Sequence, residues 1–259
     1  MKAKKSYGQH FLTQSAIAQR IAESLTGYGD YKHILEIGPG TGMLTQFLCQ
    51  SPYQLKLIEA DQDMVAYITK HFPNISEDNI ISMDFLKLDL MQTWEGERFA
   101  IIGNFPYNIS SQIVMKMIDY KEIVPELVGM FQKEMAERII AKSGNKDYGI
   151  ISVLTQIYYE GQMLFHVSPN NFKPPPKVQS AVIRLQRRAQ PLWENDITWF
   201  KLLVKTTFNQ RRKMLRNTLR PLIANDEILE ESFFQMRPEQ LSVEQFVELA
   251  HRLEHFRKI

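Results

Sequence analysis

A glycine-rich turn between a strand-like run and a helix-like run is the feature that most constrains the fold of this chain. Residues 33–37 (His-Ile-Leu-Glu-Ile) are short, apolar and β-branched, which is typical of a buried strand. They stop at residues 38–42 (Gly-Pro-Gly-Thr-Gly), and helical periodicity resumes from Met43. A strand, a glycine turn and a helix in this order open a βαβ unit, so we expect a sheet of largely parallel strands.

The same alternation continues along the chain. Short apolar runs predict further strands, and stretches with apolar residues three or four apart predict helices. The predicted strands are residues 54–58, 80–83, 99–103 and 127–131, and the predicted helices are residues 12–26, 61–71, 109–119 and 133–142. Two later apolar runs, 161–167 and 178–185, predict an antiparallel pair that closes the sheet. The pattern indicates a doubly wound, Rossmann-like α/β fold.

The chain changes character near residue 188. No glycine occurs after Arg188, and the remaining pattern is helical. We therefore predict two domains. Residues 1–188 carry the α/β sheet and its ligand site, and residues 189–259 form a smaller, all-helical domain.

Composition argues against several kinds of protein. No apolar run approaches the roughly 20 residues that span a bilayer, and no signal-peptide segment follows the basic N-terminus, so we expect a cytoplasmic protein. A single cysteine cannot form an internal disulfide, and the six histidines lack metal-ligand spacing, so we expect no metal. Cys49 lies in an apolar helical stretch and is predicted to be a core thiol. We expect a monomer.

The glycine turn and two acidic residues predict a nucleoside site without a pyrophosphate. A dinucleotide turn would place a third glycine where Met43 stands, and the Gly-Lys-Ser/Thr of a P-loop is absent. Gly38 and Gly40 therefore suit close backbone approach to another kind of ligand. Glu59 and Asp84 follow the second and third strands, where carboxylates can accept ribose hydroxyls and an adenine amine. This combination is what S-adenosylmethionine needs.

The alternative for both acids is loop solvation or capping of a helix N-terminus. Asp61 competes with Glu59 as the cap of the helix that follows.

The segment Asn104-Phe105-Pro106-Tyr107 directly follows the fourth strand and predicts methylation of a planar amine. An adenine amine is a poor nucleophile because its lone pair is delocalised into the ring. The Asn104 side-chain oxygen and the Phe105 carbonyl can accept the two amine hydrogens and so direct the lone pair toward a methyl donor. Pro106 fixes the turn and Tyr107 stacks on a base that has left its own stack.

A loop with three consecutive prolines supplies a second aromatic candidate. Phe172 is predicted to form the far wall of the base pocket, and Lys173 and Lys177 to contact phosphates. The alternative is a phenylalanine that anchors the loop in the core.

Taken together, these motifs resemble the rRNA adenine N6,N6-dimethyltransferase family, and most closely its KsgA/RsmA branch of 16S rRNA dimethyladenosine transferases. The resemblance covers the whole chain. It rests on Gly8–Leu12, the glycine motif at 36–42, Glu59 and Asp84, the segment 103–108, and the aromatic loop at 172–182.

The resemblance implies a Rossmann-like class I S-adenosylmethionine-dependent methyltransferase. His10, Leu12, Gly38, Glu59, Asp84 and Asn104 are then expected to contact the cofactor. The substrate is expected to be two adjacent adenosines in a hairpin loop near the 3′ end of 16S rRNA, within an assembling small subunit. The chain departs from the family at His10, where many members have Asn, and at Phe105, where an aliphatic residue is common.

The charge pattern of the C-terminal region fits an RNA partner. Residues 184–220 hold ten Lys and Arg against two acids, whereas residues 221–259 hold four against eight. An apolar stripe from Phe200 to Leu219 predicts one helical surface, beside which the cations Lys201, Lys205, Arg212 and Arg216 form an arc that can follow an RNA backbone.

Other functions compete with this one. A 23S rRNA methyltransferase of the macrolide-resistance type shares the chemistry, although the three-proline loop and the basic C-terminal region argue against it. A DNA adenine methyltransferase usually has Asp or Asn before Pro-Pro-Tyr and a target-recognition domain. A non-catalytic RNA-binding assembly factor would keep the fold without turnover.

Overall fold

The computed structural model describes Lys4, residues 9–224 and residues 226–258. Gly8 of the N-terminal motif lies outside the described residues. The chain divides into two compact units, residues 1–136 with 160–187 and residues 137–159 with 188–259.

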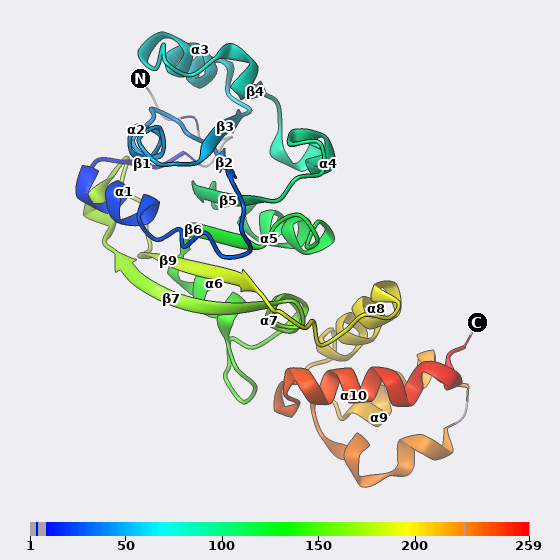
Figure 1. The fold of residues 1–259 in the computed structure, drawn as a ribbon. Helices are drawn as coiled ribbons and strands as arrows, with labels where there is room; N and C mark the ends of the chain where they lie inside the picture. Colours follow the sequence, from blue (N-terminus) through cyan, green and yellow to red (C-terminus); the bar gives the residue numbers. More distant parts are fainter. Residues whose placement is uncertain (1–3, 5–8, 225, 259) are drawn as a thin grey trace. The chain divides into compact units, whose positions relative to one another are not determined.

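A seven-stranded sheet forms the centre of the first unit, in the order β4-β3-β2-β5-β6-β9-β7 (Figure 1). Its strands are β2 (His33–Ile37), β3 (Gln54–Glu59), β4 (Ile80–Ser82), β5 (Phe99–Asn104), β6 (Glu126–Gln132), β7 (Tyr159–Val167) and β9 (Ser180–Arg187). Neighbouring strands from β4 to β6 are parallel, and β9 runs antiparallel to β6. Every residue of β2 is buried, as expected of a parallel strand covered on both faces. The predicted Rossmann-like α/β class is confirmed.

Helices cover both faces of this sheet. Figure 1 shows α1 and α2 on one face and α4 and α5 on the other. The bounds are α1 Ser15–Ala22, α2 Thr45–Leu48, α3 Gln62–His71, α4 Leu90–Thr93, α5 Ser110–Asp119 and α6 Lys133–Ile140. The helix expected after the glycine turn is short, and Cys49 at its end is exposed, so the prediction of a core thiol is wrong.

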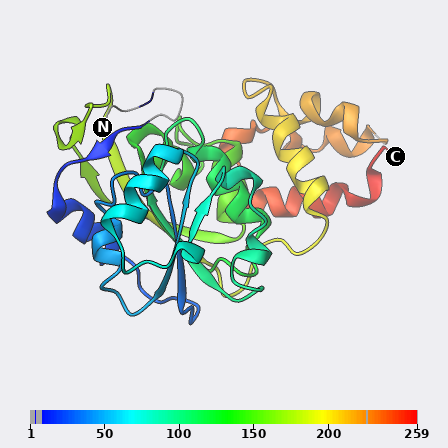
Figure 2. The same cartoon turned by 90° about the horizontal axis from the view of Figure 1, so that it is seen from above.

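A second, two-stranded sheet joins segments that are far apart in the sequence. β1 (Phe11–Leu12) pairs antiparallel with β8 (Phe172–Lys173), and Figure 2 shows the blue β1 beside the yellow-green β8. This pairing places the N-terminal motif next to the three-proline loop.

The second unit is helical apart from a single bridge between Ile223 and Arg257 among its described residues. Its α-helices are α7 (Ile150–Gln156), α8 (Ile197–Phe208), α9 (Leu215–Leu219) and α10 (Val243–Leu253), joined by short 3₁₀ turns. The boundary expected at residue 188 coincides with one crossing between the units. Residues 137–159, however, belong to the second unit because α7 buries Val153 and Leu154 and packs against α8 and α10.

The stripe expected on one continuous helical surface lies on two helices instead. Phe200, Val204, Leu215 and Leu219 are fully buried, but α8 ends at Phe208 and α9 begins at Leu215. The run Asn209-Gln210-Arg211-Arg212-Lys213 between them has no apolar residue to bury, and a helical turn without a packed face gains little stability.

Candidate active site

A cavity of about 280 Å³ opens at the carboxyl ends of β2, β3 and β5. Its wall comes from the glycine turn after β2, the ends of β3 and β5, the loop after β4, and the N-terminal residues 9–12. Parallel α/β sheets bind ligands at this edge, where the order of strands reverses. All of these segments belong to the first unit.

The glycine turn brings backbone atoms close to the cavity. Gly38 and Gly40 have positive φ angles of 67° and 55°, which L side chains rarely adopt. A Cβ atom at Gly40 would lie 3.0 Å from Cε1 of Phe11, so the Phe11 ring packs directly on this turn. Both glycines are therefore required by the shape of the site.

The sequence did not decide whether Glu59 or Asp61 caps the helix that follows β3. Asp61 accepts a hydrogen bond from the Asp63 N–H and caps α3, so Glu59 is not the cap. Glu59 ends β3, is 8% exposed, and accepts hydrogen bonds from the N–H groups of Gly40 (3.3 Å) and Asp61 (2.9 Å). A carboxylate has about four lone-pair positions, so Glu59 can still accept hydroxyl groups from the cavity.

Asp84 has both of the roles considered for it, because it caps a helical turn and also faces the cavity. Its carboxylate caps a 3₁₀ turn by accepting the Leu86 N–H at 2.9 Å, and Asp84 also lines the cavity next to Phe85. Capping orients the carboxylate without using all of its acceptor capacity.

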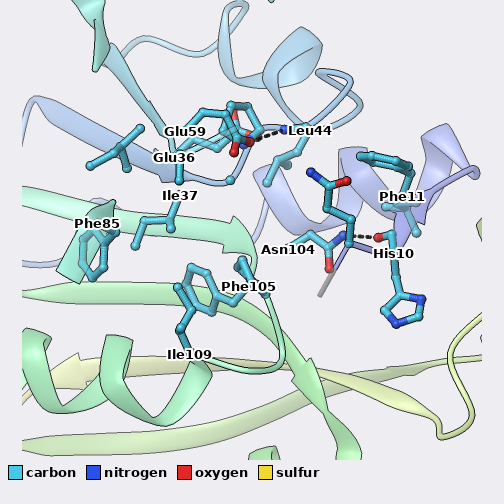
Figure 3. A pocket seen from close by; sticks show the side chains of 18 of the residues that line it. His10, Phe11, Glu36, Ile37, Leu44, Glu59, Phe85, Asn104, Phe105 and Ile109 are labelled. Carbon is cyan, nitrogen blue, oxygen red and sulfur yellow. Dashed lines mark hydrogen bonds between the residues drawn. The ribbon is translucent and has the colours of Figure 1, made fainter. Parts of the chain in front are cut away.

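A second buried carboxyl group lies beside Glu59 at the same end of the cavity (Figure 3). Glu36, on β2, accepts a hydrogen bond from the Thr45 hydroxyl at 2.8 Å. Burial raises the pKa of Glu36 to about 8, and the neighbouring Glu59 adds to the shift. Burial likewise raises the pKa of Glu59, while hydrogen bonds from the backbone of Asp61 and Gly40 oppose the shift. The cavity thus contains two carboxyl groups that a cationic ligand would stabilise in their charged forms.

The side chain of Asn104 has one defined orientation. Its Nδ2 donates to the backbone carbonyl of His10 at 3.0 Å, as Figure 3 shows. Because a carbonyl can only accept, the nitrogen of the amide must face His10 and the oxygen Oδ1 is left for the cavity. The Asn104 side chain therefore presents a hydrogen-bond acceptor to the cavity.

Phe105 lies under this segment, buried in the sheet. Its ring is 1% exposed and contacts Phe131 edge-on at 5.0 Å. Gly103 and Gly129 make room for it, since a Cβ at Gly129 would lie 2.0 Å from a ring carbon of Phe105. The ring thus anchors the segment 104–107, in addition to the backbone role expected from the sequence.

The ring that faces Tyr107 belongs to His10, at a centroid distance of 5.3 Å and an interplanar angle of 28°. The Tyr107 hydroxyl is hydrogen-bonded to the Ser180 hydroxyl at 2.6 Å. Phe172, which we expected as the far wall of the base pocket, is 4% exposed within the hydrophobic core and does not line the cavity. Its pairing with Leu12 in the small sheet turns it inward, so here it has the alternative role of a core anchor.

The whole chain resembles known proteins. Residues 1–255 match the model of the family described as ribosomal RNA adenine dimethylase. The chain belongs to the ribosomal RNA adenine dimethylase family.

Individual relatives agree with this assignment. Ribosomal RNA small subunit methyltransferase A of Flavobacterium johnsoniae is 49% identical over 98% of this chain and 97% of its own length. The protein of the same name from Parabacteroides distasonis is 50% identical over 96% and 93%. The crystal structure of the 23S rRNA methyltransferase ErmE has a TM-score of 0.70 at 27% identity, over 94% of this chain and 99% of that one. A dimethyladenosine transferase from Plasmodium falciparum has the same fold, with a TM-score of 0.77 at 23% identity over 96% and 100%. As a member of a dimethylase family, the chain is a methyltransferase.

Most of the catalytic and cofactor-binding residues that we predicted from the sequence lie around one cavity. His10, Leu12, Gly38, Gly40, Glu59, Asp84 and the segment 104–107 all line it. Gln9, Phe11 and Glu36 line it as well, although from the sequence we named them only as members of longer motifs and not as site residues. Glu36 could have been found from the sequence, because it is a charged residue within an apolar strand, and such a residue is rarely buried without a specific role.

The predicted RNA-contacting cations are divided between the two units. Lys173 and Lys177 are exposed on the three-proline loop of the first unit, and the other four belong to the second unit. Lys205 and Arg212 are exposed, and neither forms an ion pair with another described residue. Arg216 lies 3.8 Å from the Glu230 carboxylate, which partly neutralises it.

Proposed function

We propose that this chain transfers methyl groups from S-adenosylmethionine to the N6 amines of two adjacent adenosines, in a hairpin loop near the 3′ end of 16S rRNA. The observation that carries this proposal is the orientation of Asn104, whose Oδ1 faces a cavity suited to a nucleoside. Relatives that are 49–50% identical are named ribosomal RNA small subunit methyltransferase A, which supports the small-subunit target. Such an activity belongs to the cytoplasm, during assembly of the subunit.

The residues of the cavity fit the proposed cofactor. Glu59 would hold the ribose hydroxyls, Asp84 the adenine amine, and the backbone at Gly38 and Gly40 would pass close to the methionine part. Phe85 offers an apolar contact for the adenine ring. When bound, S-adenosylmethionine supplies an activated methyl group on a sulfonium.

The protein's own contribution to the transfer is orientation. Asn104 Oδ1 and the Phe105 carbonyl accept the two hydrogens of the target amine, which turns its lone pair toward the cofactor. Asn104 cannot take up a proton, so the amine proton leaves to water as the new bond forms. Tyr107, held by Ser180, provides the aromatic platform for the base.

We propose that exposed cations of both units contact the RNA backbone. They are Lys173 and Lys177 of the first unit and Lys205 and Arg212 of the second. Lys201 and Arg216 remain candidates, but the ion pair of Arg216 with Glu230 would have to be exchanged for a phosphate.

Methyl transfer from tritiated cofactor to unmethylated 30S particles, 50S particles and DNA tests the proposal. We expect label in 30S particles only. Label in 23S rRNA alone would assign the chain to the type of its ErmE neighbour, and cofactor binding without any transfer would favour a binding factor.

A further inference from the structure

The N-terminal residues 9–12 are held across the cavity by contacts with several distant segments. The His10 carbonyl accepts from Asn104, and the His10 ring nitrogen Nδ1 lies 2.8 Å from the carbonyl oxygen of Pro174. Phe11 packs on Gly40. All four residues from Gln9 to Leu12 line the cavity, so this segment has to keep its place for the site to stay intact.

The first of these residues is held by a buried carboxylate. Asp61, whose side chain is 1% exposed, accepts a hydrogen bond from Nε2 of Gln9 at 2.9 Å and another from Nζ of Lys4 at 2.6 Å. These charge-assisted bonds outweigh the effect of burial and hold the pKa of Asp61 below its usual range. Asp61 does not line the cavity.

The same residue also supports the expected ribose acceptor from behind. The Asp61 N–H donates to Oε1 of Glu59 at 2.9 Å, while Glu59 Oε2 accepts from Gly40. A continuous set of hydrogen bonds therefore runs from Gln9 through Asp61 and Glu59 to the glycine turn. Gln9 in turn directly precedes His10, whose carbonyl orients Asn104.

We propose that Asp61 is a positioning residue that fastens residues 9–12 over the cofactor cavity, and so couples retention of the cofactor to the orientation of Asn104. The inference rests on the proposed function for the identity of the cofactor. Asp61 acts through Gln9 and Glu59, which face the ligand, and it touches no reacting atom.

Two neighbouring aspartates allow a matched comparison. Asp61→Asn keeps the oxygen Oδ1 for the helix cap, where Asn is as good as Asp. It removes the negative charge that pairs with Lys4 and the second acceptor, Oδ2, that Gln9 uses. Asp63→Asn removes only the contact of Asp63 with Lys4, at a side chain that is 68% exposed and does not touch Gln9. Gln9→Ala removes the same bond from the other side, together with the hydrogen bond that Gln9 Oε1 accepts from the Lys4 N–H, and leaves the helix cap intact.

The test measures the dissociation rate of S-adenosylmethionine and the single-turnover rate of methyl transfer to 30S particles at saturating cofactor. For Asp61→Asn and Gln9→Ala we expect dissociation to be about tenfold faster (about 1.4 kcal/mol). We also expect methyl transfer to be several-fold slower in each variant. In the double variant Asp61→Asn, Gln9→Ala, both rates should change no more than in the more strongly affected single variant. Asp63→Asn should change either rate less than twofold.

Asp61→Asn behaving like Asp63→Asn would overturn the proposal, and so would fully additive effects of Asp61→Asn and Gln9→Ala. If Asp61→Asn does not fold, Gln9→Ala decides by the same two rates. Cofactor dissociation needs no RNA, so a wild-type protein that binds the cofactor without methylating 30S particles would refute the proposed function and still test the role of Asp61.

Discussion

At the scale of single residues, one hydrogen bond to a backbone carbonyl decides which atom of Asn104 faces the cavity. Asn104→Ala removes the amine acceptor and leaves Glu59 and Asp84 in place. We expect methyl transfer to fall by about 10²–10³-fold or more, while cofactor affinity falls much less. Single-turnover transfer and equilibrium binding, measured on one preparation, separate the two effects. Unchanged turnover would refute the orientation argument.

The buried carboxyl group of Glu36 predicts a pH-dependent stability. Its pKa is raised to about 8 from an ordinary value of 4.5, so between these values the folded chain keeps a proton that the unfolded chain has released. Stability therefore falls as the pH rises through this window. Glu36→Gln is neutral at every pH and should become more stable than the wild type by on the order of 1–3 kcal/mol between pH 5 and pH 9. Urea denaturation at several pH values measures this, and a difference that does not vary with pH would contradict it.

Single residues also show where sequence patterns stop being informative. The acids Glu59 and Asp84 could be assigned because each stands at a strand end. The role of Phe172 could not be assigned, because the burial of its side chain depends on the pairing of β8 with β1. No sequence periodicity connects these two segments. The bond between Asp61 and Gln9 is a contact of the same kind, and the sequence showed only that Asp61 could cap a helix.

At the scale of elements, the loop after β5 depends on a ring packed beneath it. Phe105→Ala should lower the free energy of unfolding by about 3–5 kcal/mol, because it leaves a cavity between β5 and β6. Phe105→Leu should cost less than about 1.5 kcal/mol, since an aliphatic side chain fills most of the space. Thermal and chemical denaturation of both variants check this order, and equal losses would contradict it.

Gly129 tests the same packing from the neighbouring strand. A methyl group there would overlap the Phe105 ring, so the ring and the segment 104–107 must shift. Gly129→Ala should therefore reduce methyl transfer by more than about tenfold even when the protein still folds. Gly144→Ala is not a suitable control because Gly144 has a positive φ, whereas Gly149→Ala meets no atom within 4 Å and should leave transfer unchanged.

Most elements could be predicted from the sequence because parallel strands buried on both faces leave apolar runs, and glycines mark their ends. The exceptions include α4, the small sheet of β1 and β8, α7, and the break between α8 and α9. The apolar residues of α7 are buried by α8 and α10, which lie far along the sequence. The break follows from the lack of an apolar residue between Phe208 and Met214, although the stripe on either side suggested one surface.

At the scale of the whole molecule, RNA binding should depend on cations that lack an acidic neighbour. Replacing Lys205 and Arg212 by Ala should weaken binding to 30S particles and reduce the slope of log K against log salt by about 2, one for each lost phosphate contact. Arg216→Ala, which removes a cation that is already paired with Glu230, should change the slope less. Titrations at several salt concentrations measure these slopes, and an equal loss for Arg216→Ala would contradict the distinction.

The most direct test of the proposed function is mass spectrometry of 16S and 23S rRNA after unmethylated 30S particles and 50S particles are each incubated with this protein and S-adenosylmethionine. We expect one nuclease fragment from the 3′ region to contain two adjacent N6,N6-dimethyladenosines, and the same fragment to stay unmodified with Asn104→Ala. Methylated adenine confined to 23S rRNA, or none in either rRNA although the cofactor binds, would contradict the proposed function.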